Sequence, residues 1–575
     1  MGNAFEANAQ LEGLLGRLAA RREDWAGLAV QERIALLEQV RERIAPAAAR
    51  WVALSSQAKD ITPGTPVEGE EWTSGPWALL ATCDHLLATL SGIAATGRPA
   101  LDKLKKRTVN GQLAVEVFPQ NIFDHLLLSG VRAEVWMEPG VTEANLGENV
   151  ARAYRTHHND GELGLILGAG NIASIAPLDA LHKLFSEKAV CIVKLNPVND
   201  YLLPVFEDIF APLIALDYLH FVTGAGDVGA ALCTHALVDT IHITGSQETH
   251  DLIVYGPGEA GQENRRANRP LNPKPISSEL GAVCPTIVVP GPWSAADIRF
   301  QASHIATQKL HNSGFNCVAS QVLVLPAQWE HTSALRTAVR KALADAPDRK
   351  PYYPGAASRQ SAMAACQAGA VRVNDDGARA RREVVELPPA GTPDVYARSH
   401  EVFAPTLCEQ LLDGLDAETF LRDAIRFANT SLRGTLGANI IIHPATIKAL
   451  GPRFDELLQE LHYGCIAINA WTGLGYLLTT APWGAFPGHV LNDVQSGIGS
   501  VHNTFMFDRP QRTVVQAPFR PFPRSVLGGA MTLLPNPPWF VNNKQSHNVG
   551  RKLFGFQVKP SWFKLPGIFF DALRG

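Results

Sequence analysis

From residue 161 to residue 246, short apolar runs alternate with segments of helical periodicity, and this alternation limits the fold more than any other feature. Strands that are separated by helices favour a parallel sheet with helices packed on its faces. The expected elements, in chain order, are strand 163–167, helix 176–186, strand 190–194, helix 202–215, strand 218–222, helix 226–234 and strand 240–243.

A second pattern of the same kind begins at strand 286–289 and continues to about residue 468. Its next expected elements are helix 294–311 and strand 321–325. The sequence therefore predicts an α/β fold with two doubly wound parallel-sheet domains, joined near residue 279. Alternating apolar residues across 112–138 add a projecting β-ribbon to this prediction.

Composition excludes several classes of protein. The 575 residues carry a formal net charge of −4, which does not suit phosphate recognition, so we expect no nucleic-acid partner. The eight cysteines are scattered without a C-x-x-C pair or a Cys/His cluster, so we expect no disulfide framework, no metal site and a reducing, cytoplasmic location. No secretory leader is evident, and no apolar run reaches the roughly 18 residues of a membrane span.

Glu279 and Cys317 are the strongest candidates for chemistry. Glu279 stands in Ser278-Glu279-Leu280-Gly281, and Cys317 ends the run Asn312 to Cys317, which reads NSGFNC. Small and turn-forming neighbours allow close backbone approach to a ligand, so a thiol nucleophile and a carboxylate base can share one cleft. Taken alone, the cysteine is more typical of a buried core position, and the glutamate is compatible with a helix cap or an ion pair.

Two glycine-rich turns follow expected strands. Residues 168–173 and residues 224–229 both match the dinucleotide-binding pattern G-x-G-x-x-[G/A]. Tight strand-to-helix turns need such glycines for conformational reasons alone, so each match is weak. The acidic residue that normally follows the first pattern is absent, because strand 190–194 ends in Lys194.

In this order the motifs resemble those of the aldehyde dehydrogenase superfamily. The similarity covers most of residues 20–490. It rests on six motifs: Phe221 to Gly226, Val238 to Ser246, Ser277 to Gly281, Asn312 to Cys317, Glu401 to Pro405, and Ile468-Asn469 with Pro482-Trp483-Gly484.

The resemblance implies NAD(P)-dependent oxidation of an aldehyde to a carboxylic acid through a cysteine thiohemiacetal and thioester. It implies that Cys317 is the nucleophile, Glu279 the general base and Asn171 the oxyanion donor. The cofactor-binding residues that it implies are Lys194, Gly224, Thr244, Gly245, Ser246, Glu401 and Phe403. A helix cap at Asn171, a solvated strand end at Lys194 and turn positions at Thr244 and Ser246 are the simpler alternatives.

The resemblance also assigns domains and partners. Residues 1–111 and 139–279 are expected to form the cofactor-binding domain and 280–468 the catalytic domain, while 112–138 and 469–500 bridge the domains and mediate oligomerisation. The expected partners are NAD or NADP, a small aldehyde, long-chain or aromatic, and further copies of the chain in a homodimer or homotetramer.

Four positions depart from the family pattern: Ile172, Pro197, His250 and Phe315. They leave the substrate tunnel and the choice between NAD and NADP open. They also keep two other hypotheses in view, a non-catalytic scaffold and an acyl-CoA reductase, whose motif resembles residues 167–172. Glu279 favours hydrolysis, since CoA-dependent release needs thiol exchange rather than activated water.

Residues 501–575 form a C-terminal extension with ten Lys or Arg against two Asp, and with many aromatic residues. This composition favours a subunit interface. Peripheral contact with an anionic membrane, or with a long apolar substrate, is the alternative. Five prolines interrupt the second half of the extension, so no clear amphipathic helix is expected there.

Overall fold

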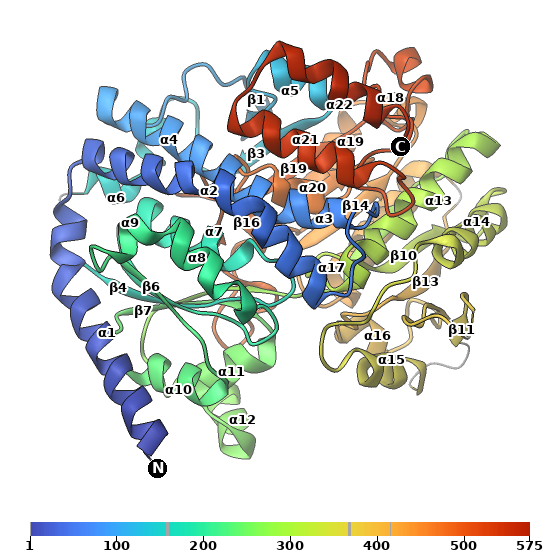
Figure 1. Ribbon diagram of the computed structural model, residues 1–575. Coiled ribbons are helices and arrows are strands. Elements are labelled where there is room, and N and C mark those ends of the chain that lie inside the picture. Colours follow the sequence, from blue (N-terminus) through green and yellow to red (C-terminus); the bar gives the residue numbers. More distant parts are fainter. Residues whose placement is uncertain (1, 157–159, 366–369, 376, 415) are drawn as a thin grey trace.

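The computed structural model describes residues 2–156, 160–365, 370–375, 377–414 and 416–575. It confirms the predicted α/β class. Two large sheets, one of 11 strands and one of six strands, each consist mainly of parallel strands (Figure 1). The chain passes from one sheet to the other between β8 (Ile276–Leu280) and β9 (Cys284–Val288), as predicted near residue 279.

The six-stranded sheet has the order β17-β8-β7-β4-β5-β6. Its strands β4 (Leu163–Leu167), β5 (Val190–Lys194), β6 (Leu219–Val222) and β7 (Thr240–Gly245) confirm the expected segments to within two residues. All neighbours are parallel except β17 (Gly497–Ile498), which pairs antiparallel with β8. The chain turns back from β6 to add β7 beside β4, so the order changes direction between β4 and β7.

Helices cover the six-stranded sheet on both faces. The connecting helices are α7 (Ile175–Leu181) with η3 (His182–Ser186), α8 (Leu203–Ile209), α9 (Ala211–Ile214), α10 (Gly226–Thr234), α11 (Gln247–Tyr255) and α12 (Gly258–Arg266). Before β4, the chain forms α1 (Gly2–Gly27) and α2 (Val30–Ala58). Trp25 and Trp51 of these two helices are fully buried, so both helices belong to the core of this domain.

The 11-stranded sheet has the order β1-β2-β3-β19-β15-β14-β9-β10-β13-β12-β11. From β19 to β12 the neighbours are parallel. Alternate residues of β10 (Ser320–Pro326) enter two separate apolar clusters, which is expected of a sheet covered on both faces. The other strands are β12 (Glu383–Glu386), β13 (Thr406–Leu412), β14 (Gly437–Ile441), β15 (Cys465–Ile468), β19 (Pro510–Gln516) and β11 (Ala370–Arg372).

Further helices lie between these strands. They are α13 (Ala295–Leu310), α14 (Thr332–Asp345), α15 (Ala356–Ala365), α16 (Tyr396–Ser399), α17 (Ala417–Ser431), α18 (Pro444–Leu450) and α19 (Pro452–Glu460). The short helix α20 (Thr472–Leu477) follows β15. Ser294 and Asp297 form a capping box at the start of α13, which orients the helix that leads to Cys317.

The predicted ribbon forms. Strands β1 (Lys106–Val109), β2 (Gln112–Phe118) and β3 (Arg132–Met137) are antiparallel, and β3 pairs with β19, which continues the 11-stranded sheet. The pairing with β19 was not predicted, and it satisfies the backbone groups along that edge of β3. A short helix, α5 (Ile122–Leu127), lies between β2 and β3. An oligomerisation role for this region stays a prediction.

The extension also differs from expectation, because its last part folds as helices α21 (Ser546–Val558) and α22 (Leu565–Ala572). The prolines fall between or at the start of the helices, where they are tolerated. Helix α21 packs against the helical stretch Glu68–Thr96, and both helices share an apolar cluster with α5 (Figure 1). Phe563 is 96% exposed, so a membrane or subunit contact there stays a prediction.

The helical stretch Glu68–Thr96 comprises α3 (Glu68–Trp72), η1 (Thr73–Trp77) and α4 (Ala78–Thr96). By length and composition it is apolar enough to cross a membrane, although no apolar run of that length was expected. In this fold 56% of its most apolar window is buried, and Leu79, Leu86 and Leu90 are part of the main core. Such burial is typical of a core helix.

Candidate functional site

The carboxyl ends of the parallel strands in the six-stranded sheet meet along one edge. The structure brings five of the predicted site residues to this edge. They are Asn171 after β4, Lys194 at the end of β5, Gly224 after β6, Gly245 at the end of β7 and Glu279 near the end of β8. Because β4 and β7 flank the change in strand order, this edge is where open α/β sheets bind ligands.

Cys317 lies on the loop that joins α13 to β10. The loop begins with the tight turn η5 (His311–Gly314), in which Asn312, Ser313 and Gly314 all have positive φ. The backbone of Gly314 approaches Ala404 so closely that a Cβ at position 314 would lie 3.0 Å from the Ala404 carbonyl carbon. Cys317 itself is half-buried, and its carbonyl accepts a hydrogen bond from the thiol of buried Cys284 at 3.5 Å. Cys284 is thus a core residue.

Glu279 and Cys317 perturb each other's titration. Burial raises the pKa of Glu279 to about 7, and the charge of Asp179 acts in the same direction, whereas hydrogen bonding from Cys317 and Trp483 opposes it. Burial and the neighbouring Glu279 raise the pKa of the Cys317 thiol well above its usual range. Oε1 of Glu279 has no hydrogen-bond partner of good geometry among the described residues. A carboxyl group that is partly ionised at neutral pH therefore faces a protonated thiol.

Asn171 is held against the cysteine loop at both its side chain and its backbone. Its Nδ2 donates to the carbonyl of Phe315 at 3.0 Å, two residues before Cys317. Its own carbonyl accepts from Asn312 Nδ2 at 3.0 Å and from the Tyr352 hydroxyl at 2.8 Å. One N–H of the Asn171 amide remains for another acceptor. The arrangement supports the oxyanion assignment over a simple helix cap, although the assignment itself stays a prediction.

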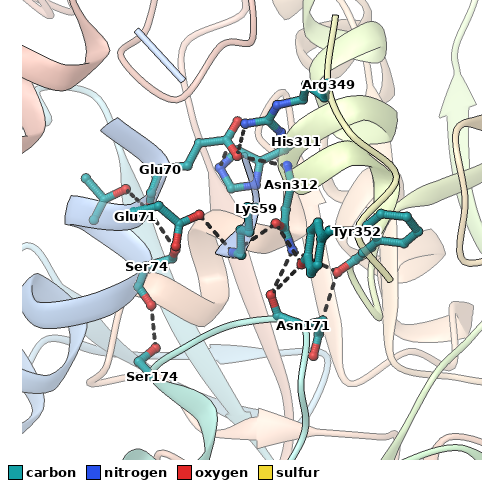
Figure 2. Close-up of polar contacts among 12 residues, drawn as sticks. Lys59, Glu70, Glu71, Ser74, Asn171, Ser174, His311, Asn312, Arg349 and Tyr352 are labelled. Atoms are coloured by element: carbon teal, nitrogen blue, oxygen red, sulfur yellow. Dashed lines mark hydrogen bonds and ion pairs between the residues drawn. The ribbon is translucent and has the colours of Figure 1, made fainter. Parts of the chain in front are cut away.

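A buried network of charges supports the Asn171 contact (Figure 2). Lys59 pairs with Glu71 at 2.8 Å and donates to Asn312 Oδ1 at 3.2 Å. On the other side, Glu70 accepts from the backbone N–H of Asn312 at 2.9 Å and pairs with Arg349 at 2.7 Å. Asn312 is thereby fixed from both sides, which holds the left-handed turn that presents Cys317.

Sequence reasoning missed this supporting network. The Asn-Ser-Gly run was a visible signal for a left-handed turn, since Asn and Gly tolerate positive φ best. Lys59, Glu71 and Tyr352 carried no such signal, because they come from segments far from residue 312 in the chain. Only the packing of α2 and α3 against the cysteine loop brings them together.

Glu401 and Phe403 lie across from the sheet edge. The Glu401 carboxylate rests directly on Gly281, where any Cβ would overlap it. Burial raises the pKa of Glu401 to about 8, although Lys309 and Arg359 favour the ionised form. Arg359 also donates to the carbonyl of Phe403 at 3.1 Å, and the Phe403 ring stands 5.7 Å from that of Phe315. The loop that carries Glu401 and Phe403 thus contacts the segment that follows Glu279.

The other predicted cofactor residues divide into those without a side-chain bonding partner among the described residues and those whose side chains already bond within the protein. Gly245 and Ser246 are exposed, and Gly224 is half-buried with φ +143°. Lys194 is 9% exposed, and its Nζ has no hydrogen-bond or ion-pair partner within the described ranges. Thr244 differs, because its hydroxyl points inward and donates to Asp179 at 3.1 Å. Ser246 accepts from Thr249 N at 3.3 Å and is the N-cap of α11.

Residues 211–475 match the sequence profile of the aldehyde dehydrogenase family, and this range contains Glu279, Cys317 and Glu401. The chain carries an aldehyde dehydrogenase domain. It is an oxidoreductase of the aldehyde dehydrogenase type, as the motifs predicted. No curated protein matches the sequence.

Solved structures with the same fold cover nearly the whole chain. Aldehyde dehydrogenase C from Pseudomonas syringae, solved with NAD+ and octanal, has 15% identity and a TM-score of 0.59 over 89% of this chain and 90% of that one. Aldehyde dehydrogenase KauB from Pseudomonas aeruginosa has 15% identity and a TM-score of 0.58, covering 88% of both chains. An NADP-dependent enzyme from Escherichia coli has 15% identity and a TM-score of 0.55, covering 88% and 89%.

The structure accounts for two of the four departures from the family pattern. Phe315 is fully buried and packs against Tyr352 and Phe403, so it fills the base of the cysteine loop with an aromatic cluster. His250 is fully buried in α11 and does not protrude from the turn at Gly245. Neither residue obstructs the predicted cofactor edge. The departures at Ile172, which is buried, and Pro197, which is exposed, have no explanation in the contacts.

Proposed function

We propose that this protein oxidises an aldehyde to a carboxylic acid with NAD or NADP, through a thiohemiacetal and a thioester on Cys317. The observation that carries the proposal is the pairing of Cys317 with a carboxyl group whose pKa is raised to about 7. A base of this pKa is suited to accept a proton from a thiol or a water at neutral pH.

The first step follows from the two side chains. The Cys317 sulfur bonds to the aldehyde carbon as the thiol proton moves to Glu279, because the strongly raised thiol pKa makes free thiolate scarce. Negative charge develops on the aldehyde oxygen. The remaining N–H of Asn171 supports its stabilisation, and such donors contribute roughly 3 kcal/mol to lowering a barrier of this kind.

The cofactor supplies the acceptor for the hydride that leaves the substrate carbon, which gives the thioester. The chain then completes the cycle. Glu279 first releases the thiol proton to solvent. The ionised carboxylate then accepts a proton from water as the water oxygen attacks the thioester carbon, the C–S bond breaks, and this proton passes to the departing sulfur, so that Cys317 leaves as the thiol. The products are a carboxylic acid, the reduced cofactor and one proton, and the protein returns to its starting state.

The residues at the sheet edge fit a dinucleotide. The N-terminal turn of α10 is uncapped by any side chain, and a Cβ at Gly226 would meet no atom within 4 Å, so phosphate groups have open space there. Lys194 offers an unpaired ammonium for a ribose hydroxyl. Glu401 offers a carboxylate near Cys317 for the second ribose.

Steady-state assays with octanal and either NAD or NADP test the proposal through the absorbance of the reduced nicotinamide. Cys317→Ala is expected to abolish turnover, whereas Cys83→Ala, which removes a buried thiol in α4, is expected to retain it. No turnover by the wild-type protein, or equal turnover by Cys317→Ala, would contradict the mechanism.

The same assay separates hydrolysis from the CoA-dependent alternative. Acid release without CoA supports the assignment of Glu279 as the base for water. Turnover that requires CoA, or reduction of an acyl-CoA by reduced cofactor, would instead show that thiol exchange releases the product.

A further inference from the structure

The C-terminal extension encloses a cavity against the rest of the protein. Helix α21 supplies Val549, Leu553 and Phe556, which lie on one helical face at four- and three-residue spacing. Helix α22 adds Ile568 and Phe569. The opposite walls come from the helical stretch Glu68–Thr96, from α5 and from α20. We call this space the extension cavity.

The lining of the extension cavity is mainly apolar, and several of its polar side chains are already paired. His85 Nδ1 lies 2.7 Å from the Thr479 hydroxyl, and Gln557 donates to Asp84 at 2.7 Å. Thr480 donates to the Val117 carbonyl at 3.1 Å. A sugar, nucleotide or charged ligand needs free hydrogen-bonding groups, which these side chains do not offer. The cavity is therefore suited to a hydrocarbon.

The cavity borders the catalytic centre through two of its walls. In η1, Thr73 and Trp77 line the cavity, while the carbonyl of Ser74 between them accepts from Ser174, three residues beyond Asn171. In α20, Leu474 and Leu477 line it, while the neighbouring Tyr476 interacts electrostatically with Glu279 and Cys317. Each wall has one side toward the cavity and the other toward the reacting groups.

We propose that the extension cavity binds a long unbranched hydrocarbon chain, such as that of a fatty aldehyde or fatty acid. Its volume is about 230 Å³, which exceeds the cavity of about 150 Å³ that stays dry and binds benzene in an engineered protein. The helices of the extension provide one side of this site, so they form a binding wall that shorter chains of the same fold would lack. The assignment of this hydrocarbon chain to the substrate rests on the proposed function.

The first experiment measures binding without catalysis. Dansylated undecanoic acid is titrated into the full-length protein, and binding is followed by the rise in dansyl fluorescence. Leu553→Trp and Leu477→Trp, which fill the cavity from opposite walls, are expected to weaken binding by about tenfold. Leu573→Trp, at a 43% exposed position of the extension outside the lining, is the matched control and is expected to bind as the wild type does.

Equal probe binding by all four proteins, or no saturable binding by the wild type, would overturn the proposal. The two walls keep this test valid if one variant fails to fold, which circular dichroism and the melting temperature would reveal.

The second experiment identifies the source of the chain. The ratio of kcat/KM for dodecanal to that for propanal is compared between the wild type and Leu553→Trp. A fall of about tenfold in this ratio, with propanal unaffected, assigns the cavity to the substrate's own chain. If the ratio is unchanged while probe binding is lost, the cavity is assigned to a fatty ligand other than the substrate. Oxidation of neither aldehyde, with probe binding intact, would contradict the proposed function and leave the cavity assignment standing.

Discussion

Glu401 occupies the space that a side chain at position 281 would need. Gly281 comes two residues after the proposed base, so the glycine couples the base strand to the loop of the proposed ribose carboxylate. We expect Gly281→Ala to displace Glu401 and to raise the KM for the cofactor about tenfold or more, with a smaller effect on aldehyde KM. Gly16→Ala, at a site where a Cβ meets no atom within 4 Å, is the control. Unchanged cofactor KM in a folded Gly281→Ala protein would contradict this coupling.

The raised pKa of Glu279 predicts the pH dependence of turnover. The ionised carboxylate is the base, and its pKa is about 7, so the rate should fall as the pH falls through this value. Glu279→Gln should lower kcat by roughly a hundredfold or more and remove this acid limb. The measurement is kcat from about pH 6 to about pH 9 in buffers of constant ionic strength. A flat wild-type profile across neutral pH would exclude Glu279 as the titrating base.

Asp179 is buried close to Glu279, and its charge helps to raise the pKa of the base. Asp179→Asn removes this charge, so we expect the acid limb of the pH profile to move to lower pH. Asp251→Asn, which changes a partly exposed carboxylate in α11, should leave the limb in place. Movement of the limb to higher pH in Asp179→Asn would show that another interaction dominates.

The Tyr352 hydroxyl joins the Asn171 carbonyl at 2.8 Å to Asn312 Oδ1 at 3.0 Å. Loss of these hydrogen bonds in Tyr352→Phe should loosen Asn171 and lower kcat by about fivefold, the effect of roughly 1 kcal/mol. Tyr353→Phe is a matched control, because the neighbouring ring packs on Phe403 without a recorded hydroxyl bond within the described residues. Equal kcat values for the two variants would argue against a positioning role for Tyr352.

Two acidic residues, Asp200 and Asp227, interact electrostatically with Lys194. If Lys194 contacts the adenosine ribose, these charges should repel the additional phosphate of NADP, so we expect NAD to be preferred. Asp227→Asn should raise kcat/KM for NADP several-fold and leave that for NAD nearly unchanged. The two cofactors are compared at low ionic strength, where surface charges are least screened. A wild-type preference for NADP would contradict this prediction.

The sequence predicted the doubly wound class because strands buried on both faces give continuous apolar runs, and these are visible in one dimension. Strands 163–167 and 190–194 coincide with β4 and β5 for this reason. The ribbon was predicted from its alternating apolar residues, whereas the pairing of β3 with β19 was not, since it joins segments distant in the chain and no local pattern encodes it. The helices of the extension were missed because its prolines were assumed to interrupt them.

The sequence by itself determined the reacting residue types, since Glu279, Cys317 and Glu401 lie in motifs whose small neighbours and order are local properties. Tertiary structure alone decided their environment. Burial raised the pKa of Glu279, the stacking of α2 and α3 on the cysteine loop brought Lys59 to Asn312, and the fold-back of α21 and α22 enclosed an apolar cavity. Desolvation and charge coupling depend on distances through space, which the order of residues along a chain does not state.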